Sequence, residues 1–393
     1  MSWLPWALLA APIVLPLGLT LFNLATWARG RRGAQATGRV SVLIPARNEA
    51  ASIEAAVRSV AASRHPVHEI VVYDDLSTDA TPAILERLSR EMPQLRVVKG
   101  FGLPDGWIGK PHACHQLARH ATGDVLVFID ADVSLTEEAV ERIASLLDRA
   151  DVATAVPRQR TETFAERLVM PLLHLTYTSW LPQVLVLASQ DPRFVAANGQ
   201  LMAMRRQTYD DLGGFGSVRH EIVDDVAFCR HAKRSGKRVV FADGDRIATC
   251  RMYTSAREVW EGFSKNIYEG IGGSPAALVA ILAVHAFFFV LPYVALSYAL
   301  IAGEGSWVAP AAAGVMGNVT LRTLLALRYR QPISGLLLHP LSIAALCAIA
   351  INSFRWSTAG RLRWAGRTYA CRAHRVAGEP APESLEPKLE TVQ

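Results

Sequence analysis

Charged residues are scarce in this sequence. They make up 19% of the 393 residues, whereas hydrophobic residues make up 51%. Soluble domains usually carry about 25% charged residues, so the composition argues for membrane segments. The formal net charge is +6, but arginines at the ends of apolar runs set membrane orientation more often than they bind nucleic acid, and we expect no nucleic-acid partner. Such arginines are Arg29, Arg31, Arg32, Arg328 and Arg330.

Cysteines are few and widely spaced. The five cysteines include no C-x-x-C pair. Their spacing argues against a disulfide framework and against a zinc site, and it suits the reducing environment of the cytoplasm. They are Cys114, Cys229, Cys250, Cys347 and Cys371.

The first apolar run has no basic segment before it. No charged residue lies between Trp3 and Trp27, a stretch long enough to span a bilayer. Because a small-residue cleavage site is also missing, we expect an uncleaved transmembrane anchor over residues 1–28 and not a signal peptide. The arginines that follow it place the next domain in the cytoplasm.

Further apolar runs lie late in the chain, at about Ala276–Ile301, Trp307–Leu327 and Ile333–Ile351. We predict transmembrane helices over residues 276–353, preceded by an interfacial segment over residues 251–275. With the anchor, they predict a multi-pass protein of the inner (plasma) membrane whose catalytic domain is cytoplasmic. His339-Pro340 breaks the last of these runs, so a re-entrant segment is the alternative to a spanning helix there. Residues 354–393 are predicted to form a basic and then disordered cytoplasmic tail.

Strand and helix patterns alternate between the anchor and the late runs, over residues 38–250. Such alternation predicts a mostly parallel α/β sheet, whose ligands bind at the carboxyl ends of the strands. We expect Pro45 to end the first strand, Asn48 to cap the first helix, and another helix to begin near Pro111. The predicted strands are Val40–Ile44, Glu69–Tyr73, Leu95–Val98 and Val125–Ile129.

Acidic clusters follow two of these strands. Asp74 and Asp75 come at the end of the second, and Asp130 and Asp132 follow the fourth. Side chains two residues apart in extended backbone project to one side, and Mg²⁺ or Mn²⁺ is typically held by one or two carboxylates plus substrate phosphates. A D-x-D sequence is also common in turns, but its position here favours a metal site with Asp130 and Asp132 as ligands.

Longer motifs run through this region in a fixed order. They are VSVLIPARNEA (40–50), VVYDDLSTDAT (71–81), GWIGKPHACHQLARHATGDVLVFIDAD (106–132), AANGQLMAMRRQTYDDLGGF (196–215) and HEIVDDVAFCRHAKRSG (220–236). These motifs resemble the inverting glycosyltransferases of family 2, whose fold is GT-A. The likeness covers about Val40 to Thr254. A finer likeness, in residues 251–266 and 364–369, points to membrane-bound members associated with carotenoid and hopanoid biosynthesis.

The resemblance implies a donor site for a nucleotide-sugar. By it, Asp130 and Asp132 serve the ribose and the metal, and Lys110 faces the diphosphate. A lysine beside a helix N-terminus independently suits an anion, although a solvated surface lysine is the alternative. The remaining implied donor-binding residues are Pro45, Arg47, Glu49, Asp74, Asp75, Asn198 and Arg251.

The resemblance also implies a catalytic base. The pair Asp224-Asp225 matches the family's glutamate–aspartate motif, with aspartate at its first position here. Inverting transfer needs a carboxylate that takes the proton of the acceptor hydroxyl. We predict Asp225 as the base and Asp224 as the orienting residue, with Glu221 as the competitor. A solvated acidic turn before a helix is the alternative.

One further apolar stretch, Leu168–Ala188, is long enough to cross a bilayer. If it crossed, Asp225 and Asp132 would lie on opposite sides of the membrane. Because the stretch contains Pro171 and Pro182, we expect it to pack against the membrane surface, with a buried core helix as the alternative.

Together these observations predict transfer of a hexose from a nucleotide-sugar, a UDP-sugar by the resemblance, to a hydroxyl of a membrane lipid such as a carotenoid or hopanoid. The transfer is expected to invert the anomeric carbon and to use Mg²⁺ or Mn²⁺. Alternatives are a polyprenyl-phosphate or polysaccharide glycosyltransferase, or a transporter with a binding domain. The missing Q-x-x-R-W motif counts against a polymer-making enzyme, and scarce intramembrane charge counts against a transporter. The sequence leaves the oligomeric state open.

Overall fold

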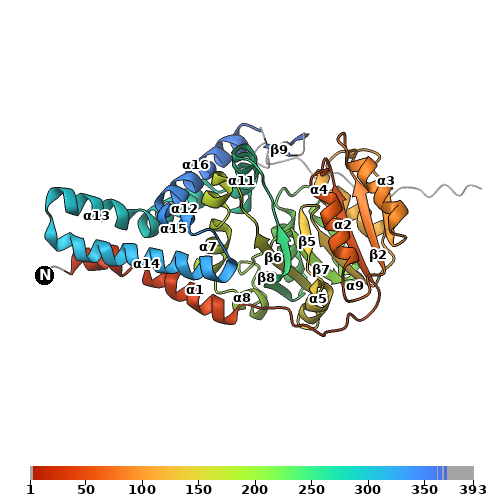
Figure 1. The fold of residues 1–393 in the computed structure, drawn as a ribbon, viewed down its shortest axis with the longest axis horizontal. Helices are drawn as coiled ribbons and strands as arrows, with labels where there is room; N and C mark the ends of the chain where they lie inside the picture. Colours follow the sequence, from red (N-terminus) through yellow and green to blue (C-terminus); the bar gives the residue numbers. More distant parts are fainter. Residues whose placement is uncertain (1–2, 361, 365–366, 370–393) are drawn as a thin grey trace, which may run out of the picture.

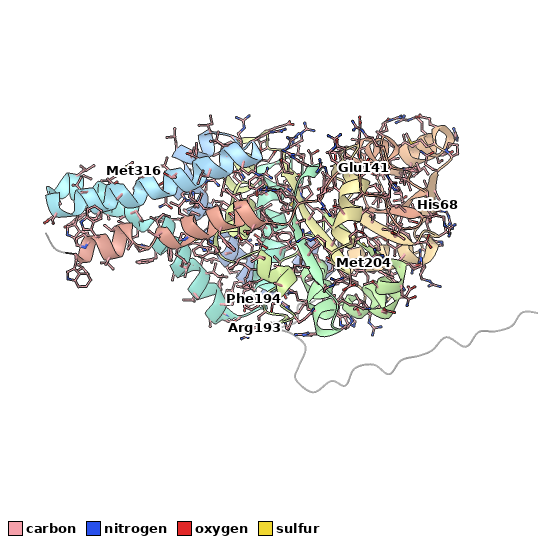
Figure 2. The ribbon with its side chains drawn as sticks, turned by 90° about the horizontal axis from the view of Figure 1, so that it is seen from below. His68, Glu141, Arg193, Phe194, Met204 and Met316 are labelled. Carbon is pink, nitrogen blue, oxygen red and sulfur yellow. The ribbon has the colours of Figure 1, made fainter. Side chains whose placement is uncertain are left out.

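The computed structural model describes residues 3–360, 362–364 and 367–369. It has two parts: an α/β part built on a large sheet, and long helices that project from it (Figure 1). Figure 2 shows the long axis, with Met316 on the projecting helices and His68 near the opposite end, on the α/β part. The tail predicted to be disordered lies mostly outside the described residues.

The large sheet has eight strands in the order β3-β2-β1-β4-β7-β6-β8-β5. Strands β3, β2, β1 and β4 are parallel to one another, whereas β7 runs antiparallel to β4. All four predicted strands are present. The strands are β1 (Val40–Ala46), β2 (Glu69–Asp74), β3 (Leu95–Lys99), β4 (Val125–Ile129), β5 (Val133–Leu135), β6 (Val152–Gln159), β7 (Leu201–Arg205) and β8 (Val239–Cys250). A separate hairpin contains β9 (Leu362–Trp364) and β10 (Arg367–Tyr369).

Helices cover both faces of this sheet, because alternate side chains of each strand point to opposite sides. Val42 and Ile44 pack against one group of helices, and Leu43 against the other. The first group is α2 (Ile53–Ala61), α3 (Thr81–Glu91) and α5 (Ala139–Leu147). The second is α4 (Gly109–His120), α9 (Arg206–Asp211), η2 (Gly214–Val218) and α10 (Asp224–Arg234).

Two local predictions near β1 are wrong. The strand continues through Pro45 to Ala46, because its pairing with β4 has already ended at Leu43 and the missing N–H of proline costs no hydrogen bond there. Asn48 does not cap α2, which begins five residues later, after Ser52. It adopts a left-handed backbone (φ 58°), and its Oδ1 accepts a 2.7 Å hydrogen bond from the N–H of Thr78. Asn48 therefore ties the end of β1 to the loop after β2.

The apolar N-terminal segment and the late helices form the projecting part (Figure 1). Among the described residues, Trp6–Thr26 and His339–Thr358 are long and apolar enough to cross a membrane, and a third span exists if α11 and α12, bent by 117°, count as one. The helices are η1 (Trp6–Ala10), α1 (Val14–Thr26), α11 (Ala256–Gly270), α12 (Pro275–Phe289), α13 (Leu291–Ala302), α14 (Gly305–Tyr329), α15 (Ser334–Leu337) and α16 (His339–Thr358).

The predicted late spans therefore need correction. Ala276–Ile301 is not one helix, because the chain breaks at Val290, where Pro292 can join only the first turn of a new helix. Trp307–Leu327 lies inside α14, which carries the buried polar residues Asn318 and Arg322 and does not reach the apolarity of a candidate span. The expected break at His339-Pro340 is present, between α15 and α16.

The apolar stretch Leu168–Ala188 is not a spanning helix either, as predicted. Pro171 and Pro182 divide it, and the pieces are α6 (Phe164–Val169), α7 (Leu172–Ser179) and α8 (Val184–Ala188). The anchor helix α1 lies against it: the amide of Asn23 donates to the carbonyls of Thr178 and Leu181, at 2.7 and 2.8 Å. Much of the stretch is buried inside the protein, and its contact with a membrane surface stays a prediction.

Two helix ends are fastened to strand β8 by a cluster that we call the β8 clamp. Arg328, at the end of α14, pairs with Asp243 and, at 3.1 Å, with Asp245. Arg29, just after α1, pairs with Asp243 at 3.3 Å. The indole N–H of Trp27 donates to a backbone carbonyl of β8 at 2.9 Å. The clamp therefore joins the projecting helices to the sheet by charged and neutral hydrogen bonds.

Candidate active site

A single cavity of about 1040 Å³ lies where the two parts of the molecule meet. The carboxyl ends of β1 and β4, and the residue that follows β2, form one side of it. The starts of α4 and α10 continue the wall, and α7, α11, α12 and α16 close the other side. Parallel strands bring their carboxyl ends to one edge, so Asp75, Asp130 and Asp132 line one crevice.

The ends of β1 and β2 contribute a hydrogen-bonded corner of the cavity. The Arg47 guanidinium donates to the backbone carbonyl of Asp75 at 2.5 Å, and the Asp75 N–H donates to the carbonyl of Ala46 at 2.8 Å. Burial, followed by the negative charge of Asp132, raises the pKa of the Glu49 carboxyl to about 7. The residues Pro45, Arg47, Glu49 and Asp75 therefore lie together at the cavity wall.

The end of β4 contributes the D-x-D pair, with a lysine beside it. The Lys110 ammonium lies 2.5 Å from Asp130 Oδ1 and donates to the carbonyl of Gly199 at 3.1 Å. Burial alone would lower the pKa of Lys110, but the carboxylates of Asp130 and Asp224 outweigh it and raise this pKa. Lys110 stays charged, in the first turn of α4, where an anion is favoured.

The D-x-D pair fits a divalent metal ion. Asp132 Oδ1 is buried and has no hydrogen-bond partner among the described residues, and burial, together with Asp130, raises the pKa of Asp132. A cation would satisfy that oxygen and hold the carboxyl ionised. The described residues contain no cluster of three or more ligating side chains. A Mg²⁺ or Mn²⁺ site completed by donor phosphates needs only one or two carboxylates.

A tight turn at Asn198-Gly199-Gln200 lies between Lys110 and Asp225. Asn198 is held by Thr154, whose hydroxyl donates to its carbonyl at 2.8 Å. A Cβ atom on Gly199 would lie 3.2 Å from Lys110 Nζ and 3.2 Å from Asp225 Cβ. A larger residue here would crowd both side chains, each of which would have to move by a few tenths of an ångström.

Asp224 and Asp225 are the first two residues of α10, and both line the cavity. Burial raises the pKa of Asp224, although Lys110 opposes this shift. The Val226 N–H donates to Asp225 Oδ1 at 2.8 Å, which fixes that carboxylate. Glu221, the competing base, precedes the helix and does not belong to the cavity wall.

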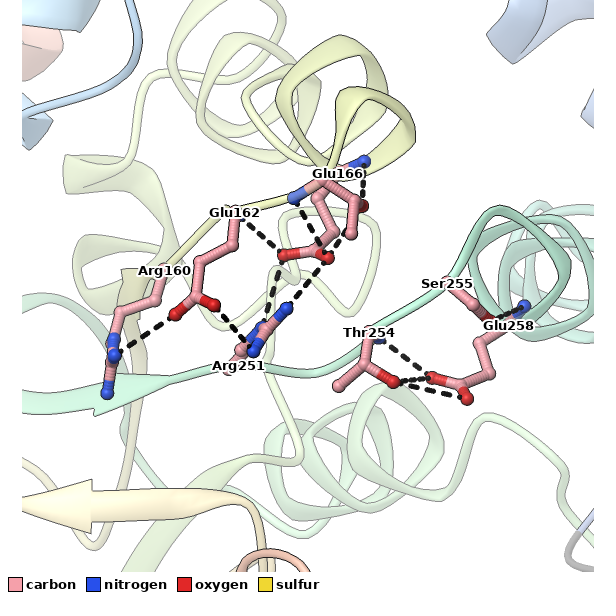
Figure 3. A network of polar contacts seen from close by, with 8 residues as sticks. Arg160, Glu162, Glu166, Arg251, Thr254, Ser255 and Glu258 are labelled. Carbon is pink, nitrogen blue, oxygen red and sulfur yellow. Dashed lines mark hydrogen bonds and ion pairs between the residues drawn. The ribbon is translucent and has the colours of Figure 1, made fainter.

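Two predicted donor-binding residues lie outside the cavity wall. Asp74 turns back and accepts a 3.0 Å hydrogen bond from the N–H of Ser77. Arg251 pairs with Glu162 at 2.8 Å and with Glu166 at 3.2 Å (Figure 3). These contacts favour a positioning role for both residues over direct contact with a donor.

Glu166 is the centre of the network in Figure 3. It forms a capping box with Thr163 at the start of α6, and it is fully buried. Burial alone would raise the pKa of Glu166, but hydrogen bonds from Arg251 and Thr163 hold this pKa below its ordinary value. The network therefore fixes α6, the helix that leads into α7, to the end of β8.

Several residues of the wall were missed by sequence reasoning. The most important is Lys265, the only lysine of α11, whose charge interacts with those of Lys110, Asp130 and Asp224. The segment 251–266 signalled only a subfamily likeness, and no periodicity shows that α11 folds back over the strand ends. Tyr253 and Asn266 join the wall for the same reason.

Comparison with known proteins agrees with this geometry. The sequence model of "Glycosyl transferase family 2" matches residues 41–213. The chain contains a glycosyl transferase family 2 domain. The matched segment of this family 2 domain includes Asp130 and Asp132 and ends before Asp224.

Two relatives extend the comparison beyond the family 2 domain. The chain is 26% identical over 340 residues to a 4,4'-diaponeurosporenoate glycosyltransferase of Staphylococcus aureus, covering 84% of this chain and 88% of the relative. The solved structure of mannosyltransferase PcManGT from Pyrobaculum calidifontis, in complex with GDP-Man and Mn²⁺, has a TM-score of 0.51 at 20% identity. It covers 89% of this chain and 98% of that one. The structural likeness confirms the predicted GT-A fold, and the family 2 match together with the S. aureus relative supports glycosyl transfer.

Proposed function

We propose that this glycosyltransferase transfers a hexose from a nucleotide-sugar, with UDP as the nucleotide, to a hydroxyl of a membrane lipid, with inversion at the anomeric carbon. The observation that carries the proposal is the cavity of about 1040 Å³. Lys110, Lys265 and the D-x-D pair line one side of it, Asp225 lines it as well, and the remaining walls are apolar. A donor and a lipid acceptor can therefore meet without leaving the protein.

The donor lies at the strand-end side in this proposal. Pro45, Arg47, Glu49 and Asp75 surround the nucleoside, because they form the corner at the ends of β1 and β2. Lys110 and Lys265 face the diphosphate, whose charge they complement. Asn198 holds the turn beside the sugar.

Asp130 and Asp132 would hold the metal ion together with phosphate oxygens of the donor. A bound Mg²⁺ or Mn²⁺ supplies charge neutralisation for the departing nucleoside diphosphate. The bound Mn²⁺ of the P. calidifontis structure is in line with this assignment. Lys110 holds Asp130 from the other side and orients it.

Asp225 takes the proton of the acceptor hydroxyl in the proposed transfer. As this proton leaves, the acceptor oxygen attacks the anomeric carbon from the face opposite the diphosphate, and the bond to the diphosphate breaks. Asp224, held beside Lys110, orients the start of α10. The Gly199 turn keeps the base and the diphosphate cation close together.

The acceptor class rests on the cavity and on the relative. The S. aureus relative acts, by its name, on a diaponeurosporenoate, which is a carboxylate. Ester formation on a lipid carboxylate is therefore a second candidate, and it needs no base because a carboxylate is already ionised at neutral pH. Loss of activity in Asp225→Asn toward alcohols but not toward acids would identify this second reaction.

The proposal places the protein in the plasma membrane as a multi-pass protein with a cytoplasmic catalytic domain and α11 at the interface. Large apolar side chains are exposed on the projecting helices, which suits contact with lipid. They include Val14, Leu300, Ile301, Met316 and Leu327. Cysteines introduced at Ser217 in a cysteine-free variant should resist an impermeant thiol reagent in intact cells, and labelling there would overturn the orientation.

The decisive test uses purified protein in lipid nanodiscs with a labelled UDP-hexose and a lipid extract. We expect a glycolipid of inverted configuration to form only when the metal is present, as detected by mass spectrometry and NMR. The Asp132→Asn variant should form none. If the donor is consumed while no glycolipid forms from any extract, the proposed lipid acceptor is wrong.

A further inference from the structure

The cavity continues beyond the reacting groups, into a space between α7, α12 and α16. We call this space the tail arm. It belongs to the same cavity as Asp225 and the D-x-D pair. Residues that line it are Leu173, Trp180, Ile281, Val284, Leu346 and Cys347.

The tail arm differs in character from the rest of the cavity. No Asp, Glu, Lys or Arg reaches it from α7, α12 or α16, whereas the strand-end side is crowded with such residues. Ala280, on α12, is exposed at the surface and still lines the cavity, so the arm opens beside that helix. An apolar channel with a side opening suits a ligand that arrives from lipid and not from water.

Two aromatic rings, those of Trp180 and His285, interrupt the aliphatic wall of the arm. The indole Nε1 of Trp180 and Nε2 of His285 are both buried and have no hydrogen-bond partner among the described residues. The two rings lie against each other, with centroids 5.4 Å apart. The arm is therefore lined here by two aromatic rings beside aliphatic side chains, which suits an apolar occupant.

We infer that the tail arm holds the linear apolar chain of the lipid acceptor, and that residues of α12 and α16 set how long a chain fits. This inference rests on the proposed function, because it takes the reactive end of the same molecule to lie at Asp225. The chain enters beside α12 and runs between α12 and α16. The shared cavity favours this occupant, because a chain held in the arm can present its reactive end to Asp225.

Adjacent residues on each helix provide matched test variants. Cys347 lines the arm, whereas its neighbour Ala348 is exposed on the outer face of α16. On α12, Val284 lines the arm and its neighbour Ala283 is exposed. Cys347→Trp and Val284→Trp should fill the arm, and Ala348→Trp and Ala283→Trp should leave it open.

The experiment measures transfer from labelled UDP-hexose to water-soluble 1-alkanols and alkanoates of increasing length, with the full chain in nanodiscs. For the natural protein, kcat/KM should rise about fourfold with each methylene that enters the arm. The inward tryptophan variants should lose this rise beyond the shortest chains, and the outward variants should keep it. Leu346→Ala, which widens the arm, should move the preference to longer chains.

Donor hydrolysis without acceptor and donor affinity are measured on every variant as checks of folding and of the donor site. If both are normal and the inward variants keep the chain-length dependence of the natural protein, the tail-arm assignment is wrong. If the natural protein hydrolyses the donor but glycosylates no alkanol, alkanoate or lipid, the proposed function itself fails, and the inference fails with it.

Discussion

The two ends of the cavity are built in different ways. The strand-end side takes its residues from short motifs directly after β1, β2 and β4, whose positions backbone pairing fixes, and from the starts of α4 and α10. The tail arm takes its residues from three helices that are far apart in the sequence and meet only through packing. The polar end should therefore be sensitive to single charges, and the apolar end to side-chain volume.

The largest effect is expected at the metal pair. Asp132→Asn should abolish transfer and sharply weaken donor binding in the presence of Mg²⁺ or Mn²⁺, because it removes the unpaired carboxylate oxygen that fits the ion. Calorimetry with UDP-hexose, with and without metal, checks both parts. Near-normal metal-dependent turnover would remove Asp132 from the metal site.

The next effect concerns the base. Asp225→Asn should lower kcat by roughly two to four orders of magnitude while donor affinity stays almost unchanged, because a base acts only on the acceptor proton. Glu221→Gln is the control and should be mild, since Glu221 does not belong to the cavity wall. If Glu221→Gln is inactive while Asp225→Asn still transfers the sugar, then Glu221 and not Asp225 is the base.

A smaller loss is expected from one added methyl group. Gly199→Ala places a Cβ atom 3.2 Å from both Lys110 Nζ and Asp225 Cβ, and we expect about tenfold lower kcat/KM because small displacements of catalytic groups are costly. Gly18→Ala is the matched control, since nothing lies within 4 Å of its Cβ position. Equal activity of the two variants would show that the turn tolerates the methyl group.

The smallest effect on chemistry, but a measurable one on stability, is expected at Glu166. Glu166→Gln should lower the free energy of unfolding by about 1–3 kcal/mol at pH 7. The reason is that a neutral amide replaces the buried carboxylate that accepts hydrogen bonds from the Arg251 guanidinium. The pKa of Glu166 is lowered in the folded state, so its ionised form stabilises the fold above the ordinary carboxyl pKa, and this contribution fades as the pH falls through the lowered pKa. Thermal unfolding of both proteins at pH 7 and pH 4 checks it. An equal difference at the two pH values would contradict the role of ionisation.

The sequence allowed most of the strand-end side to be predicted. Val125–Ile129 is a buried apolar run and forms β4 with these bounds, and the residues after such a strand can lie only at its carboxyl end. Asp130 and Asp132 consequently lie at the cavity, and Lys110 and Asp225 line it from the starts of α4 and α10.

The other side of the cavity could not be predicted from local patterns. Lys265 reaches the wall because α11 folds back over the strand ends, which depends on packing against α6 and α16. The long apolar run 276–301 shows no charge at its break, and only the position of Pro292 marks it. Arg251 has the residue type of a donor-binding group, yet two glutamates from another segment occupy its guanidinium.

The β8 clamp has a consequence for which lipids can react. Arg29 and Arg328 converge on Asp243, so the projecting helices and the sheet are joined at two separate chain segments and not by a loose tether. If the projecting helices insert into a membrane as proposed, the clamp fixes the height of Asp225 relative to the bilayer. A lipid whose reactive oxygen lies too deep or too shallow would then not reach Asp225, whatever its chain length. In that case the clamp would make depth in the membrane a criterion of substrate choice.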